Sequence, residues 1–209
     1  MKRLSIIGCI VAVFLLAGSA WAADRGMYVG VGGTLAVEYF DAQEFDTVRP
    51  YGFDPSYDNT WGIYGRFGYK LHPALSLEVA LEYLSGFNAS QTFTWAGSSQ
   101  ASFDSDLDVF TIMAAAKLYP PLPGIVKPYF VAGLGLMKAS FDTTVSAPGY
   151  LPTSSSNDET DPCGKLGIGV DIFINPTLSV NVEAAYTSGF SELDTVRYFG
   201  LSAGLGFHF

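Results

Sequence analysis

The chain has 209 residues, of which 49% are hydrophobic and 15% aromatic, and its formal net charge is −9. This length suits one domain or a single barrel, and the sequence shows no sign of a second domain. The acidic balance argues against nucleic acid as a partner, because phosphates require a basic face on the protein.

The first 22 residues are predicted to be a cleaved export signal. Two basic residues precede a short apolar run (6–17), and small residues follow at Ala20 and Ala22. The run is shorter than the roughly 18 residues of a membrane-spanning helix, so we expect cleavage after Ala22. The mature domain is then 23–209, in which Cys163 is the single cysteine and an intramolecular disulfide is excluded.

After the signal, eight stretches alternate apolar and polar residues with a period of two, which is typical of strands with two different faces. In chain order the expected strands are 27–40, 60–71, 75–83, 106–119, 127–141, 165–174, 178–187 and 196–209. The long connections between them are expected at 41–59, 85–105 and 142–162, and they alternate with short ones. Short turns on one side and long loops on the other are typical of outer-membrane barrels. The sequence therefore predicts an all-β fold, an eight-stranded antiparallel up-and-down transmembrane β-barrel.

The alternation alone does not show which face is inside, because a soluble lipocalin-type barrel also alternates, with its apolar face inward. Three features favour an apolar exterior. Glycine is frequent on the polar face, where it relieves crowding inside a narrow barrel filled by side chains. Aromatic residues recur near the strand ends of the apolar face. The charges of the polar face are mixed and could pair inside, with Arg66 and Lys70 opposite Glu78 and Glu82. The full predicted interior ion network is Glu38, Arg66, Lys70, Glu78, Glu82, Lys117, Asp171 and Glu183.

Four segments carry a resemblance to a known family: GMYVGVGG from Gly26, KPYFVAGLG from Lys127, GIGVDIFINPTLSV from Gly167, and the terminal GLGFHF. The chain resembles the small outer-membrane β-barrels that include the OmpA transmembrane domain and the opacity-type surface proteins. The resemblance implies location in the outer membrane of a Gram-negative cell. It also implies that the barrel-assembly machinery reads the terminal strand, at Leu205, Phe207 and Phe209.

The sequence offers no catalytic constellation and no cofactor site. His72 and His208 are both expected on the periplasmic side, away from the outer rim where a barrel enzyme would meet its substrate. Asp104, Asp106 and Asp108 alternate in a way that could bind Ca²⁺, but no EF-hand pattern completes the site. A solvated acidic rim is the favoured interpretation, and no metal site is predicted.

We therefore expect a non-enzymatic structural or surface-interaction protein with a packed polar interior, acting through its extracellular loops. Phe87, Phe93, Trp95 and Phe103 are the candidate contact residues; they could meet a partner, pack as a lid or touch lipopolysaccharide. The alternative function is a narrow pore or a transporter of small molecules, hydrophobic ones included, as in OmpW-like barrels. The expected partners of this monomer are outer-membrane lipid, lipopolysaccharide, the barrel-assembly machinery and an unidentified extracellular ligand.

Overall fold

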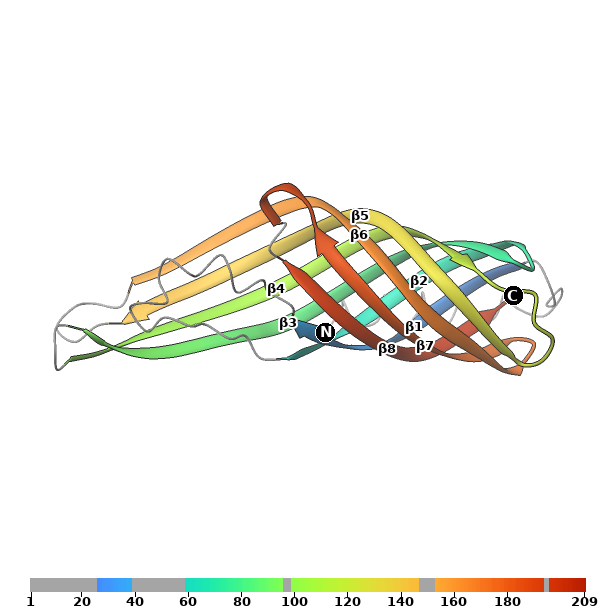
Figure 1. Cartoon of the computed structure of the whole chain (residues 1–209), viewed down its shortest axis with the longest axis horizontal. Helices are drawn as coiled ribbons and strands as arrows, with labels where there is room; N and C mark the ends of the chain where they lie inside the picture. Colours follow the sequence, from blue (N-terminus) through green and yellow to red (C-terminus); the bar gives the residue numbers. More distant parts are fainter. Residues whose placement is uncertain (1–25, 39–58, 96–98, 147–152, 194–195) are drawn as a thin grey trace, which may run out of the picture.

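The computed structural model describes residues 26–38, 59–95, 99–146, 153–193 and 196–209; the predicted signal segment lies outside them. Eight strands form one closed antiparallel barrel in chain order, with β1 pairing to both β2 and β8 (Figure 1). The strands are β1 Gly26–Glu38, β2 Thr60–His72, β3 Leu75–Trp95, β4 Ser99–Leu118, β5 Val126–Ser146, β6 Thr153–Asn175, β7 Leu178–Gly189 and β8 Arg197–His208. The predicted fold class is confirmed. Among the described residues, no helix has the length and hydropathy needed to span a bilayer.

Alternate residues of the barrel wall point inward and outward, and the apolar set points outward. On β2, Trp61 and Ile63 are exposed whereas Gly62 and Tyr64 between them are buried. Leu134 on β5 is 68% exposed, although it lies in the middle of a strand. Water would oppose so much exposed apolar surface, whereas lipid acyl chains would not. The facing predicted from the glycines and the charges is therefore the facing that the structure has.

Two glycines let tyrosine rings lie flat against the inner wall. A Cβ atom on Gly68 would collide with the ring of Tyr28, and one on Gly169 would collide with the ring of Tyr129. Neither contact leaves room for any side chain larger than hydrogen. Glycine thus permits a dense aromatic filling of a barrel with only eight strands.

Four strands are much longer than predicted, because the regions 85–105 and 142–162 are mostly strand rather than loop. β2 stops pairing with β3 at Ser85, and β7 stops pairing with β6 at Cys163. Beyond these points β3 to β6 continue as an open four-stranded sheet, which we call the sheet extension (residues 86–95, 99–107, 138–146 and 153–162). It projects from one end of the barrel in Figure 1, opposite the end that carries the short turns. Ten residues of strand span roughly 30 Å.

Candidate functional site

The barrel interior contains an ion network centred on two glutamates. Glu183 on β7 receives Lys165 Nζ at 2.7 Å, the Arg66 guanidinium at 3.3 Å and the hydroxyl of Tyr129 at 2.9 Å. These side chains come from β2, β5, β6 and β7, so the contacts cross the lumen as well as the sheet. Buried charges are tolerated only when paired and hydrogen-bonded in this way.

Glu78 on β3 is the second centre of the network. Its carboxylate lies 2.9 Å from Lys117 Nζ and 4.0 Å from the Arg66 guanidinium, and it accepts a hydrogen bond of 2.8 Å from the hydroxyl of Tyr28. Arg66 therefore lies between the two glutamates and joins their halves of the network. Lys117 is 1% exposed and also faces the ring of Tyr129, with 4.5 Å between its ammonium and the ring centroid.

The remaining predicted network residues take other partners. Glu82 accepts hydrogen bonds from the hydroxyls of Thr34 at 2.7 Å and Tyr198 at 2.8 Å, and Asp171 accepts one from Tyr119 at 2.9 Å. Lys70 lies at the short-turn end, 5.3 Å from the ring centroid of Tyr119. From the predicted opposition of Arg66 and Lys70 to Glu78 and Glu82, the contact between Arg66 and Glu78 is confirmed, at 4.0 Å. The side chain of Glu38 lies outside the described part of the structure.

Lys165 is the network residue that the sequence analysis missed. It lies on the polar face of its strand, two residues before Gly167, and this alternation was the available signal. Beside the network the described side chains leave little empty space. The cavity bordered by Arg66, Glu78 and Glu82 has a volume of about 10 Å³, which holds one water molecule at most.

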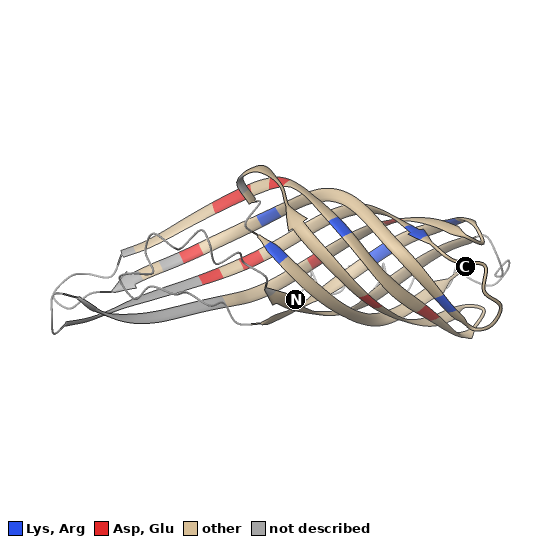
Figure 2. Ribbon diagram, viewed as in Figure 1, with Lys and Arg blue, Asp and Glu red and all other residues tan. Residues whose placement is uncertain are grey.

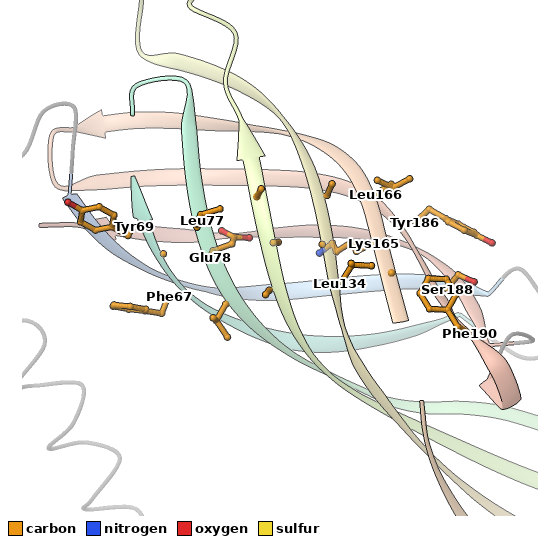
Figure 3. A pocket seen from close by; sticks show the side chains of 18 residues that line it. Phe67, Tyr69, Leu77, Glu78, Leu134, Lys165, Leu166, Tyr186, Ser188 and Phe190 are labelled. Atoms are coloured by element: carbon orange, nitrogen blue, oxygen red, sulfur yellow. The ribbon is translucent and has the colours of Figure 1, made fainter. Parts of the chain in front are cut away.

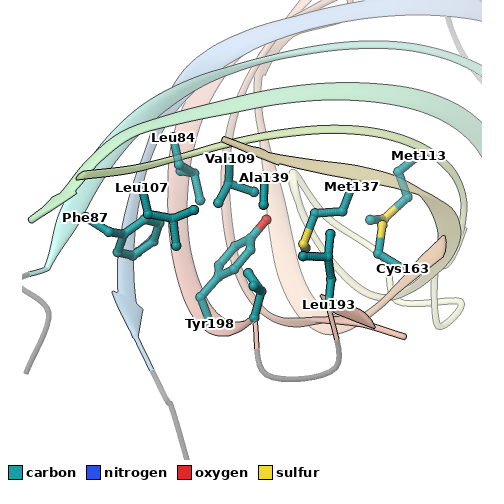
Figure 4. Close-up of a cluster of buried hydrophobic side chains, with 12 residues drawn as sticks. Leu84, Phe87, Leu107, Val109, Met113, Met137, Ala139, Cys163, Leu193 and Tyr198 are labelled. Atoms are coloured by element: carbon teal, nitrogen blue, oxygen red, sulfur yellow. The ribbon is translucent and has the colours of Figure 1, made fainter. Parts of the chain in front are cut away.

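Above the ion network the lumen is closed by an apolar cluster instead of a polar one (Figure 4). Its larger members are Leu84, Phe87, Leu107, Val109, Met113, Met137, Leu193 and Tyr198, and the buried thiol of Cys163 lies among them. The short 3-10 helix Ser191–Leu193 supplies Leu193, whose N–H donates a 2.9 Å hydrogen bond to Asp161. The expectation of a polar interior therefore describes only the half of the lumen nearer the short turns.

The aromatic contact candidates fall in the sheet extension. Phe87 is 2% exposed and packs inside the apolar cluster, so it is not available to an external partner. Backbone pairing places Phe93 opposite Ala101, Trp95 opposite Ser99, and Phe103 opposite Gln91. The side chains of Phe93, Trp95 and Phe103 lie outside the described part of the structure.

Acidic residues recur along the strands near the base of the sheet extension (Figure 2). Asp106 and Asp142 are directly opposite each other on β4 and β5, and both are exposed. The ammonium of Lys138 lies 2.8 Å from the Asp158 carboxylate, and its hydrogen bond lowers the pKa of that carboxyl. Like charges opposite each other destabilise a sheet, so the pairing of Asp106 with Asp142 lowers the stability of the extension. Within the described residues, no three His, Cys, Asp or Glu side chains are placed to hold a metal ion.

A serine–histidine contact lies at the short-turn end of the interior. The hydroxyl of Ser179 is 2.8 Å from His208 Nε2, and the His208 ring packs on Phe173 with 4.8 Å between ring centroids. Ser179 is 1% exposed, so no substrate can approach its hydroxyl. This pair fills part of the interior next to the short turns.

The predicted assembly signal lies where the barrel closes. Phe209 and Met27 exchange two backbone hydrogen bonds of 2.9 Å, and the next pairs join Phe207 to Val29 and Leu205 to Val31. These three pairs join the last strand to the first along the final ladder of the sheet. The terminal residues therefore take part in closure itself, whatever machinery reads them.

Replacing Phe209 by Ser is expected to lower the amount of folded barrel in the outer membrane several-fold, because the closing ladder then ends on a polar side chain. Heat-modifiable migration in gels of isolated membranes measures the folded fraction. Phe199→Ser, on the same outward face of the same strand but away from the terminus, is the control that should leave assembly unchanged. Normal amounts of folded Phe209→Ser would rule out the terminal aromatic residue as an assembly signal.

A closed eight-stranded barrel with an apolar exterior and a filled interior is a transmembrane barrel of the outer-membrane class. The family of outer membrane protein beta-barrel domains matches residues 9–209, and the chain belongs to this family. Its location is accordingly the outer membrane. Barrels of this class have their short turns on the periplasmic side and their longer connections outside the cell, and we orient the barrel by this rule. No curated protein sequence matches the chain.

Several solved structures share the fold. Neisserial surface protein A is 20% identical, with a TM-score of 0.54 over 90% of this chain and 99% of its own. Ail, the attachment invasion locus protein of Yersinia pestis, solved in complex with the heparin analogue sucrose octasulfate, is 16% identical with a TM-score of 0.53, over 90% and 100% of the two chains. A major outer membrane protein of Thermus thermophilus is 12% identical with a TM-score of 0.55, over 88% and 99%. At these identities the likeness concerns the fold alone.

Proposed function

We propose that this protein is a non-enzymatic surface-interaction protein, in which the barrel is the anchor and the sheet extension is the contact element. The observation that carries the proposal is the continuation of β3 to β6 beyond the last pairs made by β2 and β7. A barrel that only spanned the membrane would not need an ordered sheet projecting roughly 30 Å from it. Binding elements are commonly presented on such rigid supports.

A pore is the second candidate, and the packed interior argues against it. The two glutamate-centred halves of the ion network and the apolar cluster lie one above the other in the lumen. Solute passage would require the displacement of both layers. Planar-bilayer recording tests this point, and steady channels of defined size from the intact barrel would favour the pore.

The charge of the sheet extension indicates the class of partner. Four carboxylates and one lysine lie on its outer face and at its base among the described residues: Asp106, Asp108, Asp142, Asp158 and Lys138. A sulfated polysaccharide of the kind represented in the Ail complex would be repelled by this surface. A cationic protein segment or a basic surface would be attracted to it. The proposed partner is therefore basic.

The test is a barrel whose extension has been shortened. Replacing residues 88–106 and residues 140–158 each by Asn-Gly shortens both hairpins of the extension and removes Asp106, Asp142 and Asp158. Phe87 then stays opposite Leu107 and Ala139 opposite Glu159, so the apolar cluster keeps its buried side chains. Cells carrying this variant are expected to bind polylysine-coated beads about tenfold less than wild type at low salt. Heparin-coated beads should bind neither wild-type cells nor cells that carry the shortened barrel.

The double variant Asp106→Asn/Asp142→Asn is the matched control for charge, since it keeps the length of the sheet. It should lose most of the salt-dependent part of polylysine binding and remain heat-modifiable. Equal binding by wild type and the shortened barrel would contradict the proposal. Stronger binding to heparin than to polylysine would contradict the assignment of a basic partner.

A further inference from the structure

An apolar groove crosses the lipid-facing surface of the barrel from β2 to β7 (Figure 3). Its volume is about 1110 Å³. The floor consists of Ala114, Ala116 and Ala132, whereas Leu77 and Leu134 form parts of the two walls. Ala116 and Ala132 are directly opposite each other on β4 and β5, and Ala114 is opposite Leu134. Small side chains on neighbouring strands thus hollow out a surface that elsewhere carries large apolar residues.

The groove is apolar over most of its lining, and its extracellular end carries two hydroxyl groups beside the ring of Phe190. Tyr186 and Ser188 line that end, close to the last residue of β7. Across the β7–β8 ladder Ser188 is directly opposite Arg197, which shares its outward face. The charged ends of two other lining residues, Glu78 and Lys165, are paired inside the barrel with Lys117 and Glu183. Arg197 therefore places a cation beside the end of the groove at which Ser188 lies.

An apolar channel with a cation at its outer end matches an amphiphile that has an anionic head and an acyl chain. In the bilayer the groove must be filled, because an empty depression would forfeit the dispersion contacts of its lining. A second copy of the barrel would bring another apolar face, whereas an amphiphile brings an acyl chain to the groove and an anion to Arg197 together. A guanidinium carries five N–H donors and can bind a phosphate through two of them while it keeps another contact.

We propose that this groove seats one acyl chain of lipid A, the phosphorylated glycolipid of the outer leaflet, and that Arg197 binds its phosphate. The outer leaflet is favoured over the inner one because Ser188 and, opposite it, Arg197 lie at the extracellular end of the groove. The site is independent of the sheet extension, so its test does not depend on the proposed surface-interaction function.

The experiment uses the purified full-length mature barrel in neutral detergent micelles, with lipid A, dephosphorylated lipid A or phosphatidylglycerol as the added probe. Native mass spectrometry counts the lipid molecules retained by each barrel. The double variant Ala114→Leu/Ala132→Leu fills the floor with apolar atoms that the membrane tolerates. It is expected to lower retention of lipid A about tenfold. Ala203→Leu, on the lipid-facing side of β8 and outside the groove, is the matched control and should retain wild-type binding.

Arg197→Gln tests the contact with the head of the lipid separately from the contact with its acyl chain, because it does not alter the floor of the groove. It is expected to lower retention of lipid A about tenfold, to the level shown by dephosphorylated lipid A with the wild-type barrel. If the variant with the filled floor retained as much lipid A as the wild-type barrel, the proposed site would be wrong. Equal retention of phosphatidylglycerol would overturn the assignment to lipid A, and a barrel dimer abolished by the filled variant would show that the groove binds a second copy instead.

Discussion

Replacing Glu183 by Ala is expected to lower the free energy of unfolding of the barrel by about 3–5 kcal/mol. The change removes the carboxylate that pairs with Lys165 and Arg66 and accepts the hydroxyl of Tyr129. Two cations are then left inside the lumen without their main partner, and one buried hydroxyl loses its acceptor. Urea unfolding of the detergent-refolded barrel, followed by tryptophan fluorescence, measures the loss.

Two variants show whether the effect comes from the buried charge. Glu183→Gln keeps an acceptor for the hydroxyl of Tyr129 but removes the charge, so its loss of stability should be intermediate. Asp158→Ala breaks an ion pair whose side chains are both about half exposed, and it should cause no measurable change. If Glu183→Ala unfolded at the same urea concentration as Asp158→Ala, the network would not be a source of barrel stability.

The barrel wall could be predicted from the sequence because a two-residue period is a local property. The hairpin of β2 and β3 shows this well. The predicted strand 60–71 is observed as Thr60–His72, and the next strand begins at Leu75, as predicted. The inward facing of the polar set was also predictable, because glycine and mixed charge have a physical use inside a narrow barrel.

The sheet extension was missed because the period changes phase. The pairing of β3 with β4 shifts between Leu84 and Phe87, and Gly86 has a positive φ of 83°. A bulge of this kind inserts a residue, so Leu84 and Phe87 face the same side although they are three positions apart. Beyond the bulge the strand is rich in Ser, Thr and Asn, a composition that predicts loop when the alternation is lost.

The partners inside the lumen could not be read from neighbouring strands. Arg66 on β2 reaches Glu183 on β7, and these strands are not adjacent in the sheet. Sequence pattern assigns a residue to a face, but distances across the lumen depend on barrel diameter and on which tyrosines occupy the space between. The apolar half of the interior could not be predicted from the sequence for a related reason. Leu84, Val109 and Met137 lie on the inner face, which the sequence as a whole marks as polar.

Replacing Leu134 by Arg is expected to cost about 2–4 kcal/mol of folding free energy, because it places a cation on the lipid face near mid-membrane. Leu134 is 68% exposed in the middle of β5, and the neighbouring outward residues on the adjacent strands, Ala114 and Gly164, offer no counter-charge. Reversible unfolding in guanidinium from phospholipid vesicles measures the change.

The depth dependence of this cost is what distinguishes hydrocarbon from water around the barrel. Leu118 is 56% exposed but is the last residue of β4, near the short turns. Leu118→Arg is therefore expected to cost only about 0–1 kcal/mol, since its guanidinium can reach the periplasmic interface. Equal costs at the two positions would mean that Leu134 is not surrounded by acyl chains. A large cost at Leu134 and a small one at Leu118 require a hydrophobic slab around the middle of the barrel, which no soluble barrel with exposed leucines would show.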